Sequence, residues 1–170
     1  MNAWLSAEAR VPGRLDLPSG HHLRPIRVED LTIDHPAVMG SQPRLWERFG
    51  RVWGWPPADM TIGQDREDLI RHVDEMSRHE SFNFAILDEP EHQLLGCLYI
   101  DPPETADHDA EVCWWVVDHE VGGALELCLD VAVPRWLEDH WPLTRPRIIG
   151  RDITWDAWHA EARIDQAAPP

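Results

Sequence analysis

Apolar residues recur at helical spacing in three stretches of the chain. Within 42–53 they fall at i, i+1, i+4, i+7 and i+8, which places them on one helix face, and a Gly-Trp-Pro-Pro run ends the pattern. Thr61 and Gln64 have the form of a capping box before a second helix, about 62–79, whose apolar residues form one stripe. The segment 34–40 predicts a further short helix.

Five other stretches are typical of strands. Residues 22–27 alternate between apolar and polar side chains, and Phe82–Leu87 and Gln93–Ile100 flank a polar turn. Ala110–Val117 is nearly continuous in apolar residues, so we expect a central strand that is covered on both faces. Arg145–Ile149 predicts a last short strand.

The segment 124–140 fits two patterns. Alternate apolar residues from Leu125 to Val133 are typical of a strand, whereas the spacing of Leu125, Leu129 and Val133 is typical of a helix. The length of the segment favours the helix. Pro134 would then kink or break it, at a cost of about 3 kcal/mol if nothing relieves the strain.

The order of elements predicts an α+β (mixed α/β) fold. A strand and helices precede three strands, a helix and a final strand, so we expect a mostly antiparallel sheet with a parallel pair around the last helix. A length of 170 residues suits one domain. We place this domain at 22–158, after a flexible N-terminal arm at 1–21 and before a frayed tail at 159–170.

The chain is strongly acidic, with a net charge of −16 from 31 acidic residues against 15 basic ones, all of them Arg. Such a charge disfavours nucleic acid and anionic membrane surfaces as partners. No apolar run approaches the length of about 18 residues that a membrane span needs, and the first residues do not have the form of a signal peptide. Three Cys lie in apolar runs without metal spacing, which predicts free thiols and a cytoplasmic protein.

Ten Trp accompany a single Tyr. Large aromatic side chains fill cores and interfaces, because each buries a large area and carries one donor. Exposed Trp side chains at 141, 155 and 158 would suit a homodimer interface.

Several segments resemble motifs of a divergent subgroup of the GNAT acyltransferases. They are 96–102 (GCLYIDP), 110–116 (AEVCWWV), and the Trp-Pro and Gly-Arg pairs at 141–142 and 150–151. The resemblance covers about residues 22–150. It implies the GNAT fold and acetyl-CoA as cosubstrate, with no metal.

The same resemblance implies where acetyl-CoA would bind. In the family, the pantetheine arm pairs with the strand before a glycine loop, and the loop and the following helix bind the pyrophosphate. The matching positions here are Trp115, Val116, Val117, Gly122, Gly123 and Ala124.

The glycine loop departs from the family pattern. His119 stands where Gln or Arg is expected, and Asp118, Glu120 and Glu126 bring like charge to the phosphate position. Two unit charges 4 Å apart repel by about 4 kcal/mol at a surface-like dielectric. A plain Gly-Gly turn before a helix is the alternative interpretation.

Acyl transfer to an amine needs a base, and Glu111 is the first candidate because it is the one charge in an apolar strand. A solvated Glu at the start of a strand is the alternative, and His108 and Asp109 are further candidate bases. By resemblance, a Tyr protonates the leaving thiolate, and Tyr99 is the only Tyr. The His residues form no zinc motif, so no metal is expected.

Two functions remain open. The first is transfer of an acetyl group from acetyl-CoA to a small amine or an amino-terminal acceptor; an acidic loop at 104–109 would suit a cationic amine. The second is a catalytically silent GNAT-like module that binds a ligand or a partner. The family resemblance favours the first, whereas the degraded phosphate loop, a C-terminal part shorter than in the family and the surplus of Trp favour the second.

Overall fold

The computed structural model describes residues 4–6 and 8–167, with side chains up to Glu161. Six strands form a single sheet in sequence order. Neighbouring strands run antiparallel except the last two, which are parallel. The strands are β1 (Leu15–Asp16), β2 (His22–Pro25), β3 (Phe82–Leu87), β4 (Leu94–Asp101), β5 (Ala110–Val116) and β6 (Pro146–Ile148).

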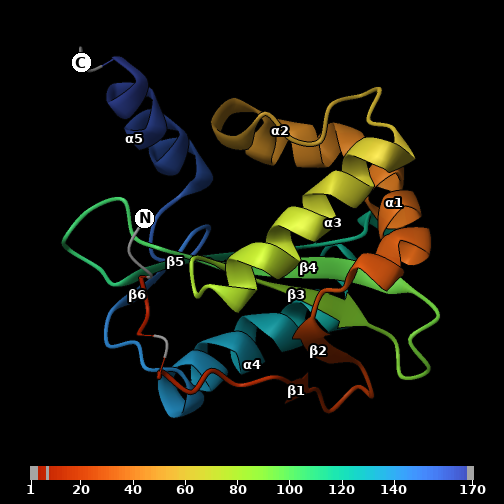
Figure 1. Cartoon of the computed structure of the whole chain (residues 1–170), viewed down its shortest axis with the longest axis horizontal. Helices are drawn as coiled ribbons and strands as arrows, with labels where there is room; N and C mark the ends of the chain where they lie inside the picture. The colour runs from red at the N-terminus through yellow and green to blue at the C-terminus, as the bar shows by residue number, and fades with distance from the viewer. Residues whose placement is uncertain (1–3, 7, 168–170) are drawn as a thin grey trace.

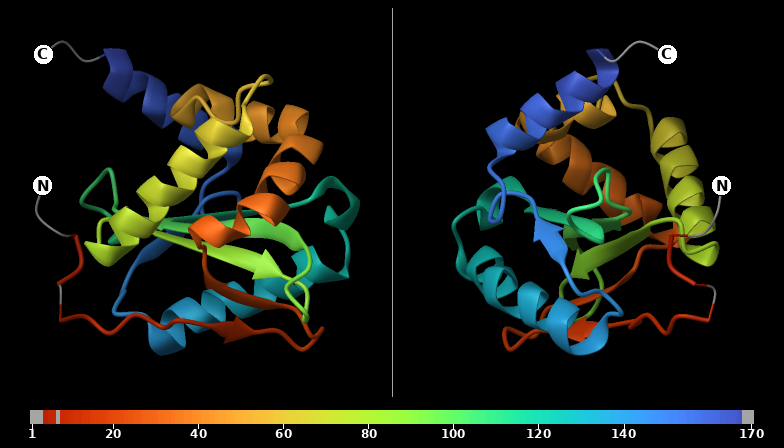
Figure 2. Two further views of the ribbon diagram at one scale, coloured as in Figure 1. Left: turned by 45° about the vertical axis from the view of Figure 1, so that its right-hand side comes forward. Right: turned by 90° about the vertical axis from the view of Figure 1, so that its left-hand side faces the viewer.

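Five α-helices cover the two faces of this sheet, which confirms the predicted mixed α/β fold. Figure 1 shows α4 on one face and the other helices on the opposite face, and both views of Figure 2 agree. The helices are α1 (Leu31–Gly40), α2 (Gln42–Trp53), α3 (Ile62–Ser77), α4 (Ala124–His140) and α5 (Trp155–Ala167). Two short 3-10 helices, η1 (Val28–Asp30) and η2 (Asp118–Glu120), precede α1 and α4.

Local sequence signals determine where α2 and α3 begin and end. The Thr61 hydroxyl accepts a hydrogen bond from the Gln64 amide at 3.3 Å, and the Gln64 side chain accepts one from the Thr61 amide at 2.8 Å. This is the predicted capping box. At the end of α2, Gly54 has a φ of 64°, a left-handed conformation that glycine adopts without steric cost.

The ambiguous segment 124–140 is the helix α4, and it continues through Pro134. Its apolar stripe, which includes Leu125, Leu129 and Val133, is buried under the sheet. Burial of this stripe offsets the free-energy cost of the backbone hydrogen bond that Pro134 cannot make.

Trp141 and Trp158 are buried within the chain, with 5% and 2% of their surface exposed. Trp155 is partly buried and packs edge-on against Phe49 and Trp158. The three Trp side chains that were expected to be exposed at a homodimer interface are therefore buried or partly buried. Trp155 and Trp158 pack between α5 and α2, whereas Trp141 packs against Phe82, Phe84 and Trp136 on the α4 side of the sheet.

Two segments expected outside the domain carry regular structure. Within 1–21, β1 pairs with β2, and Leu17 is buried with 5% exposure. Within 159–170, α5 continues to Ala167. The domain limits themselves remain a prediction.

Within the described residues, no helix combines the length and the apolar character that crossing a membrane requires.

Candidate functional site

Strand β5 separates from β6 halfway along its length. Ala110–Val112 pairs with Pro146–Ile148, and the Ile149 amide donates to the Val112 carbonyl at 2.9 Å. Beyond Val112, the described residues of β6 offer no further partner to β5. The C-terminal half of β5 therefore has one edge that β6 leaves uncovered.

The register with β4 shows which backbone groups lie on that edge. The Val117 amide donates to the Leu95 carbonyl at 2.9 Å, so alternate residues of β5, including Trp115, form hydrogen bonds toward β4. The N–H and C=O groups of Trp114 and Val116 then face away from β4, toward the opening. Of the three strand residues expected to meet the cosubstrate, Val116 presents its backbone there, whereas Trp115 and Val117 face β4.

Arg44 reaches from α2 to this edge. Its guanidinium donates to the Val116 carbonyl, and its Nε atom lies 2.7 Å from Asp118 Oδ1. Its Nη1 atom is buried without a hydrogen-bond partner in the structure. The open edge is therefore partly covered by a cation of the chain itself.

The glycine loop leads into the N-terminus of α4, next to the open edge. Gly122 has a φ of 69°, and Gly123 is the N-cap residue before Ala124. The Gly122 amide donates to Glu126 Oε2 at 2.6 Å. The carboxylate of Glu126 thus satisfies a helix N-terminal donor that an anionic ligand would otherwise use.

Glu111 lies at the other end of β5 and is buried, with 6% of its surface exposed. Its Oε1 atom accepts from Arg147 and lies 3.2 Å from His108 Nε2. Its Oε2 atom accepts from the Trp158 indole at 3.1 Å. Sequence reasoning placed Glu111 near a site but could not reveal Arg147, because that pairing depends on the register of β5 with β6.

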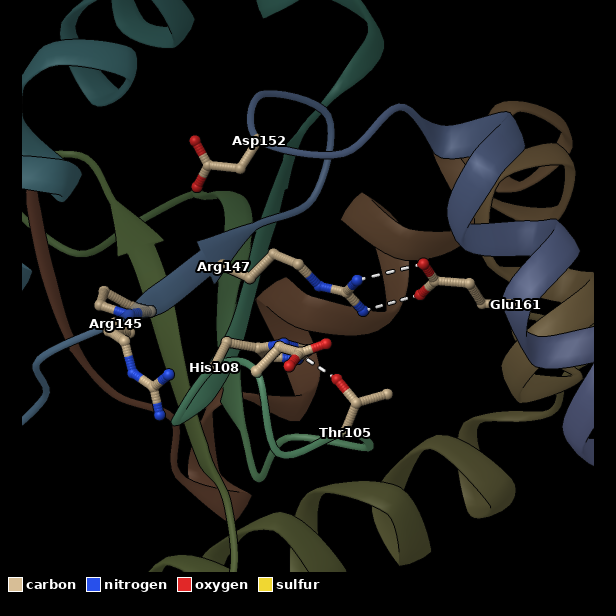
Figure 3. A pocket seen from close by; sticks show the side chains of 8 residues that line it. Thr105, His108, Arg145, Arg147, Asp152 and Glu161 are labelled. Atoms are coloured by element: carbon tan, nitrogen blue, oxygen red, sulfur yellow. Dashed lines mark hydrogen bonds and ion pairs between the residues drawn. The ribbon is translucent and has the colours of Figure 1, made fainter.

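A pocket of about 350 Å³ opens beside Glu111, between β6, the loop before β5 and α5 (Figure 3). Arg147 bridges to Glu161 of α5 through contacts of 2.9 and 3.3 Å. His108 Nδ1 lies 3.2 Å from the Thr105 hydroxyl. The pocket is lined by Thr105, Asp107, His108, Arg145, Pro146, Arg147, Asp152 and Glu161.

A second pocket, of about 360 Å³, lies on the α1 side of the sheet. Its lining joins Ser41, between α1 and α2, to Leu95 of β4 and to the connection between β5 and α4 at 117–119. The Ser41 hydroxyl accepts from the Asp118 amide at 3.2 Å and so anchors that connection.

Solved structures with a similar fold were found, whereas no family model and no curated protein matches the sequence. A putative ribosomal-protein-serine acetyltransferase from Vibrio cholerae has a TM-score of 0.64 at 13% identity, over 94% of this chain and 85% of its own. The microcin C7 self-immunity acetyltransferase MccE, in complex with acetyl-CoA and AMP, has a TM-score of 0.61 at 9% identity, over 76% and 68%. The ribosomal-protein-S5-alanine acetyltransferase from Vibrio fischeri has a TM-score of 0.53 at 16% identity, over 70% and 64%.

The chain has the GNAT fold. The aligned part spans less than two thirds of the Vibrio fischeri enzyme. The parallel pair of strands expected around the helix at 124–140 is confirmed. β5, α4 and β6 form this parallel unit of the GNAT fold, with the opening between the two strands.

Tyr99, the candidate acid, lies on β4 in this GNAT fold and has 7% of its surface exposed. Its hydroxyl accepts a hydrogen bond from the Trp115 indole at 3.0 Å. Burial raises the pKa of the Tyr99 phenol well above its usual value, so the group keeps its proton at neutral pH. The phenol is therefore protonated, as a general acid must be.

Sequence reasoning treated Asp101 only as the end of a strand, but the GNAT sheet pairs it with Glu111. Burial raises the pKa of the Asp101 carboxyl to about 7, and the nearby carboxylates of Glu75 and Glu111 add to the shift. A group that titrates near neutral pH can exchange protons during catalysis. Only the strand register brings the two acids together, so no local pattern in the sequence could have indicated this pair.

Asp109, the third candidate base, is bonded to the segment before β6. Its carboxylate accepts from the Thr144 amide and hydroxyl at 2.6 and 2.7 Å, and from the Arg145 amide at 3.0 Å. Partial burial opposes ionisation, but these hydrogen bonds lower the pKa of Asp109 overall. Asp109 holds the start of β6 in place.

Among the described residues, no three His, Cys, Asp or Glu side chains gather in a metal-binding group.

Proposed function

We propose that this protein binds acetyl-CoA at the open edge of β5 and transfers the acetyl group to an amine. The observation that carries the proposal is the separation of β5 from β6 beyond Val112, directly before the N-terminus of α4. Solved structures of the same fold support it, since MccE is in complex with acetyl-CoA.

The backbone around the opening offers suitable groups for each part of the ligand. The N–H and C=O groups of Trp114 and the N–H of Val116 face the opening and can pair with the amides of the pantetheine arm. The amides of Gly122 and Ala124 and the dipole of α4 can stabilise the pyrophosphate, whereas the Gly123 amide already donates to the Glu120 carbonyl at 2.9 Å. Glu126 must turn away for that contact to form.

The acyl transfer forms a bond from the amine nitrogen to the thioester carbonyl carbon and breaks the bond from that carbon to sulfur. Resemblance to the family makes Tyr99 the candidate donor of a proton to the thiolate; its phenol is protonated, although burial, which raises its pKa, also makes it a weaker acid. The ammonium form of the acceptor must lose a proton before it attacks. The pocket lining holds three acids, Asp107, Asp152 and Glu161, against Arg145 and Arg147. Together with the strongly acidic chain, this balance favours a cationic acceptor, either a small amine or an amino terminus.

The test combines binding and turnover on the purified chain. Acetyl-CoA is titrated into the protein in a calorimeter, and a panel of diamines, aminoglycoside-like amines and peptides is then incubated with both and analysed by mass spectrometry. We expect saturable heat and an acetyl mass increment on at least one acceptor. No heat at millimolar acetyl-CoA would contradict the proposal.

A catalytically silent GNAT-like module is the second candidate function, and specific contacts favour it. Arg44 covers the Val116 carbonyl, Glu126 covers the Gly122 amide, and Glu111 is bonded to three neighbours. Coenzyme A binding without acetylation of any amine in the panel would favour this alternative. Acetylated product would exclude it.

A further inference from the structure

His108 lies between a hydroxyl and a carboxylate at the floor of the pocket. Its Nδ1 atom is 3.2 Å from the Thr105 hydroxyl, and its Nε2 atom is 3.2 Å from Glu111 Oε1. His108 is 7% exposed, whereas Thr105 is exposed at the pocket wall. Figure 3 shows the imidazole and the Thr105 hydroxyl facing each other.

Hydrogen-bond chemistry fixes which imidazole nitrogen carries the proton. The carboxylate of Glu111 can only accept, so His108 Nε2 is the donor, and in the neutral imidazole Nδ1 is then the unprotonated nitrogen. The Thr105 hydroxyl then donates to Nδ1. The basic nitrogen of His108 is thereby directed through Thr105 toward the pocket.

Glu111 is itself held in place from two other elements. Arg147 of β6 binds Oε1, and the indole of Trp158 in α5 donates to Oε2 at 3.1 Å. These contacts fix the orientation of Glu111, and its carboxylate can stabilise an imidazolium at His108. Because both of its oxygens are committed, Glu111 is poorly placed to accept a proton from a ligand directly.

We propose that Thr105, His108 and Glu111 form a proton relay, which deprotonates an acceptor amine bound in the pocket beside β6. This inference rests on the proposed acetyl transfer. The ammonium proton passes to the Thr105 oxygen as the Thr105 hydroxyl proton passes to His108 Nδ1. The imidazolium is stabilised by Glu111 and returns its proton to solvent after the product leaves. Glu111 is thus a positioning residue, and His108 is the base.

Several charged groups surround His108 and the pocket above it. They come from the loop before β5, from β4 and β5, from β6 and the residues on either side of it, and from α5. They are Asp101, Asp107, Glu111, Arg145, Arg147, Asp152 and Glu161. A single variant at His108 leaves all of them in place, so it isolates the contribution of the imidazole.

The test measures kcat/KM against pH for an accepted amine, together with acetyl-CoA affinity by calorimetry. We expect His108→Gln to lower kcat/KM by about 10²-fold or more and to remove the limb of the pH profile that depends on the imidazole. Thr105→Val should lower the rate at least about tenfold, whereas Thr105→Ser, which keeps the hydroxyl, should retain most of it. His140→Gln, at the exposed end of α4, is the matched control.

A second measurement reports on the relay without turnover. The ¹⁵N spectrum of His108 should show the tautomer protonated at Nε2, and Glu111→Gln should remove that preference. A His108 protonated at Nδ1 would overturn the relay. So would a His108→Gln enzyme with wild-type rate and pH profile. If wild-type protein binds no acetyl-CoA, the proposed function fails and the relay fails with it; if it binds and acetylates while His108→Gln is unaffected, the relay alone fails.

Discussion

The amide of Gly122 donates a 2.6 Å hydrogen bond to the carboxylate of Glu126, four residues along in α4. A negative side chain therefore occupies the helix N-terminus where the proposed function requires a pyrophosphate. Any phosphate ligand must displace this carboxylate and also tolerate its charge. The strength of phosphate binding at this site should therefore depend on Glu126.

Glu126→Gln should tighten acetyl-CoA binding. The change removes a competing charge at the N-terminus of α4, and we expect a gain in affinity of about threefold to tenfold, or about 1 kcal/mol, at low ionic strength. Calorimetric titration measures it, and added salt should reduce the difference. Glu138→Gln removes the same charge from an exposed position near the other end of α4 and serves as control. Equal affinities for the two variants would contradict the role given to Glu126.

Asp101→Asn should stabilise the protein above neutral pH. The pKa of Asp101 rises from 3.8 to about 7 on folding, so its contribution to stability is present below about pH 4 and is lost as the pH rises toward 7. An amide carries no charge to desolvate. We therefore expect the variant to gain about 1–3 kcal/mol at about pH 8 and nothing at about pH 4.

Urea unfolding at both pH values checks this effect at Asp101. Asp139→Asn, on the exposed side of α4, is the control and should show no such pH-dependent difference. A wild-type protein that is as stable as Asp101→Asn at the higher pH would show that the carboxyl is not desolvated.

Asp34 of α1 and Asp65 of α3 form a buried carboxyl pair, and His35 Nδ1 lies 3.3 Å from Asp65. Burial raises the pKa of Asp34 well above its usual value, and the neighbouring charge of Asp65 adds to the shift. Asp34→Asn should therefore raise the melting temperature by several degrees at about pH 8 and by less at about pH 5. The exposed Asp59→Asn should show no change at either pH in the same thermal scans.

Periodicity was sufficient to locate most of the fold. The helix at 42–53 and the capping box at Thr61 could be predicted because the signals for these elements are local. The helix α5 was missed because Trp155 and Trp158 are its apolar residues, and indoles alone gave no clear stripe in a polar segment. Tertiary packing against α2 forms that helix, and no local pattern encodes such packing.

The candidate site was predictable only in part, because its chemistry depends on register. Glu111 was identified as an isolated charge, but its partner Arg147 lies 36 positions away and meets it through the parallel pairing of β5 and β6. Pairing of Asp101 with Glu111 depends on the register of β4 and β5 in the same way. His108 could be named from the sequence as an alternative base. Its contact with Thr105 could not be predicted, because it depends on the conformation of the loop before β5.

Tyr99 and Trp115 should be energetically coupled. Tyr99→Phe removes the acceptor of the Trp115 indole and leaves a buried N–H unpaired, which should cost about 1–3 kcal/mol in free energy of unfolding. Trp115→Phe should cost more, because it also leaves a cavity. The double variant should cost less than the sum of the two, as measured by denaturant unfolding. Additive costs would show that the hydrogen bond contributes little.

Acetyl-CoA binding at the open edge of β5 is tested most directly by NMR, through the backbone amide shifts of isotope-labelled protein during titration. We expect saturable shifts at the amides of Trp114, Val116, Gly122 and Gly123, since these face the opening or begin α4. Amides that point toward β4, such as that of Val117, should move less. Unchanged shifts at Trp114 and Val116 in millimolar acetyl-CoA would contradict the proposal.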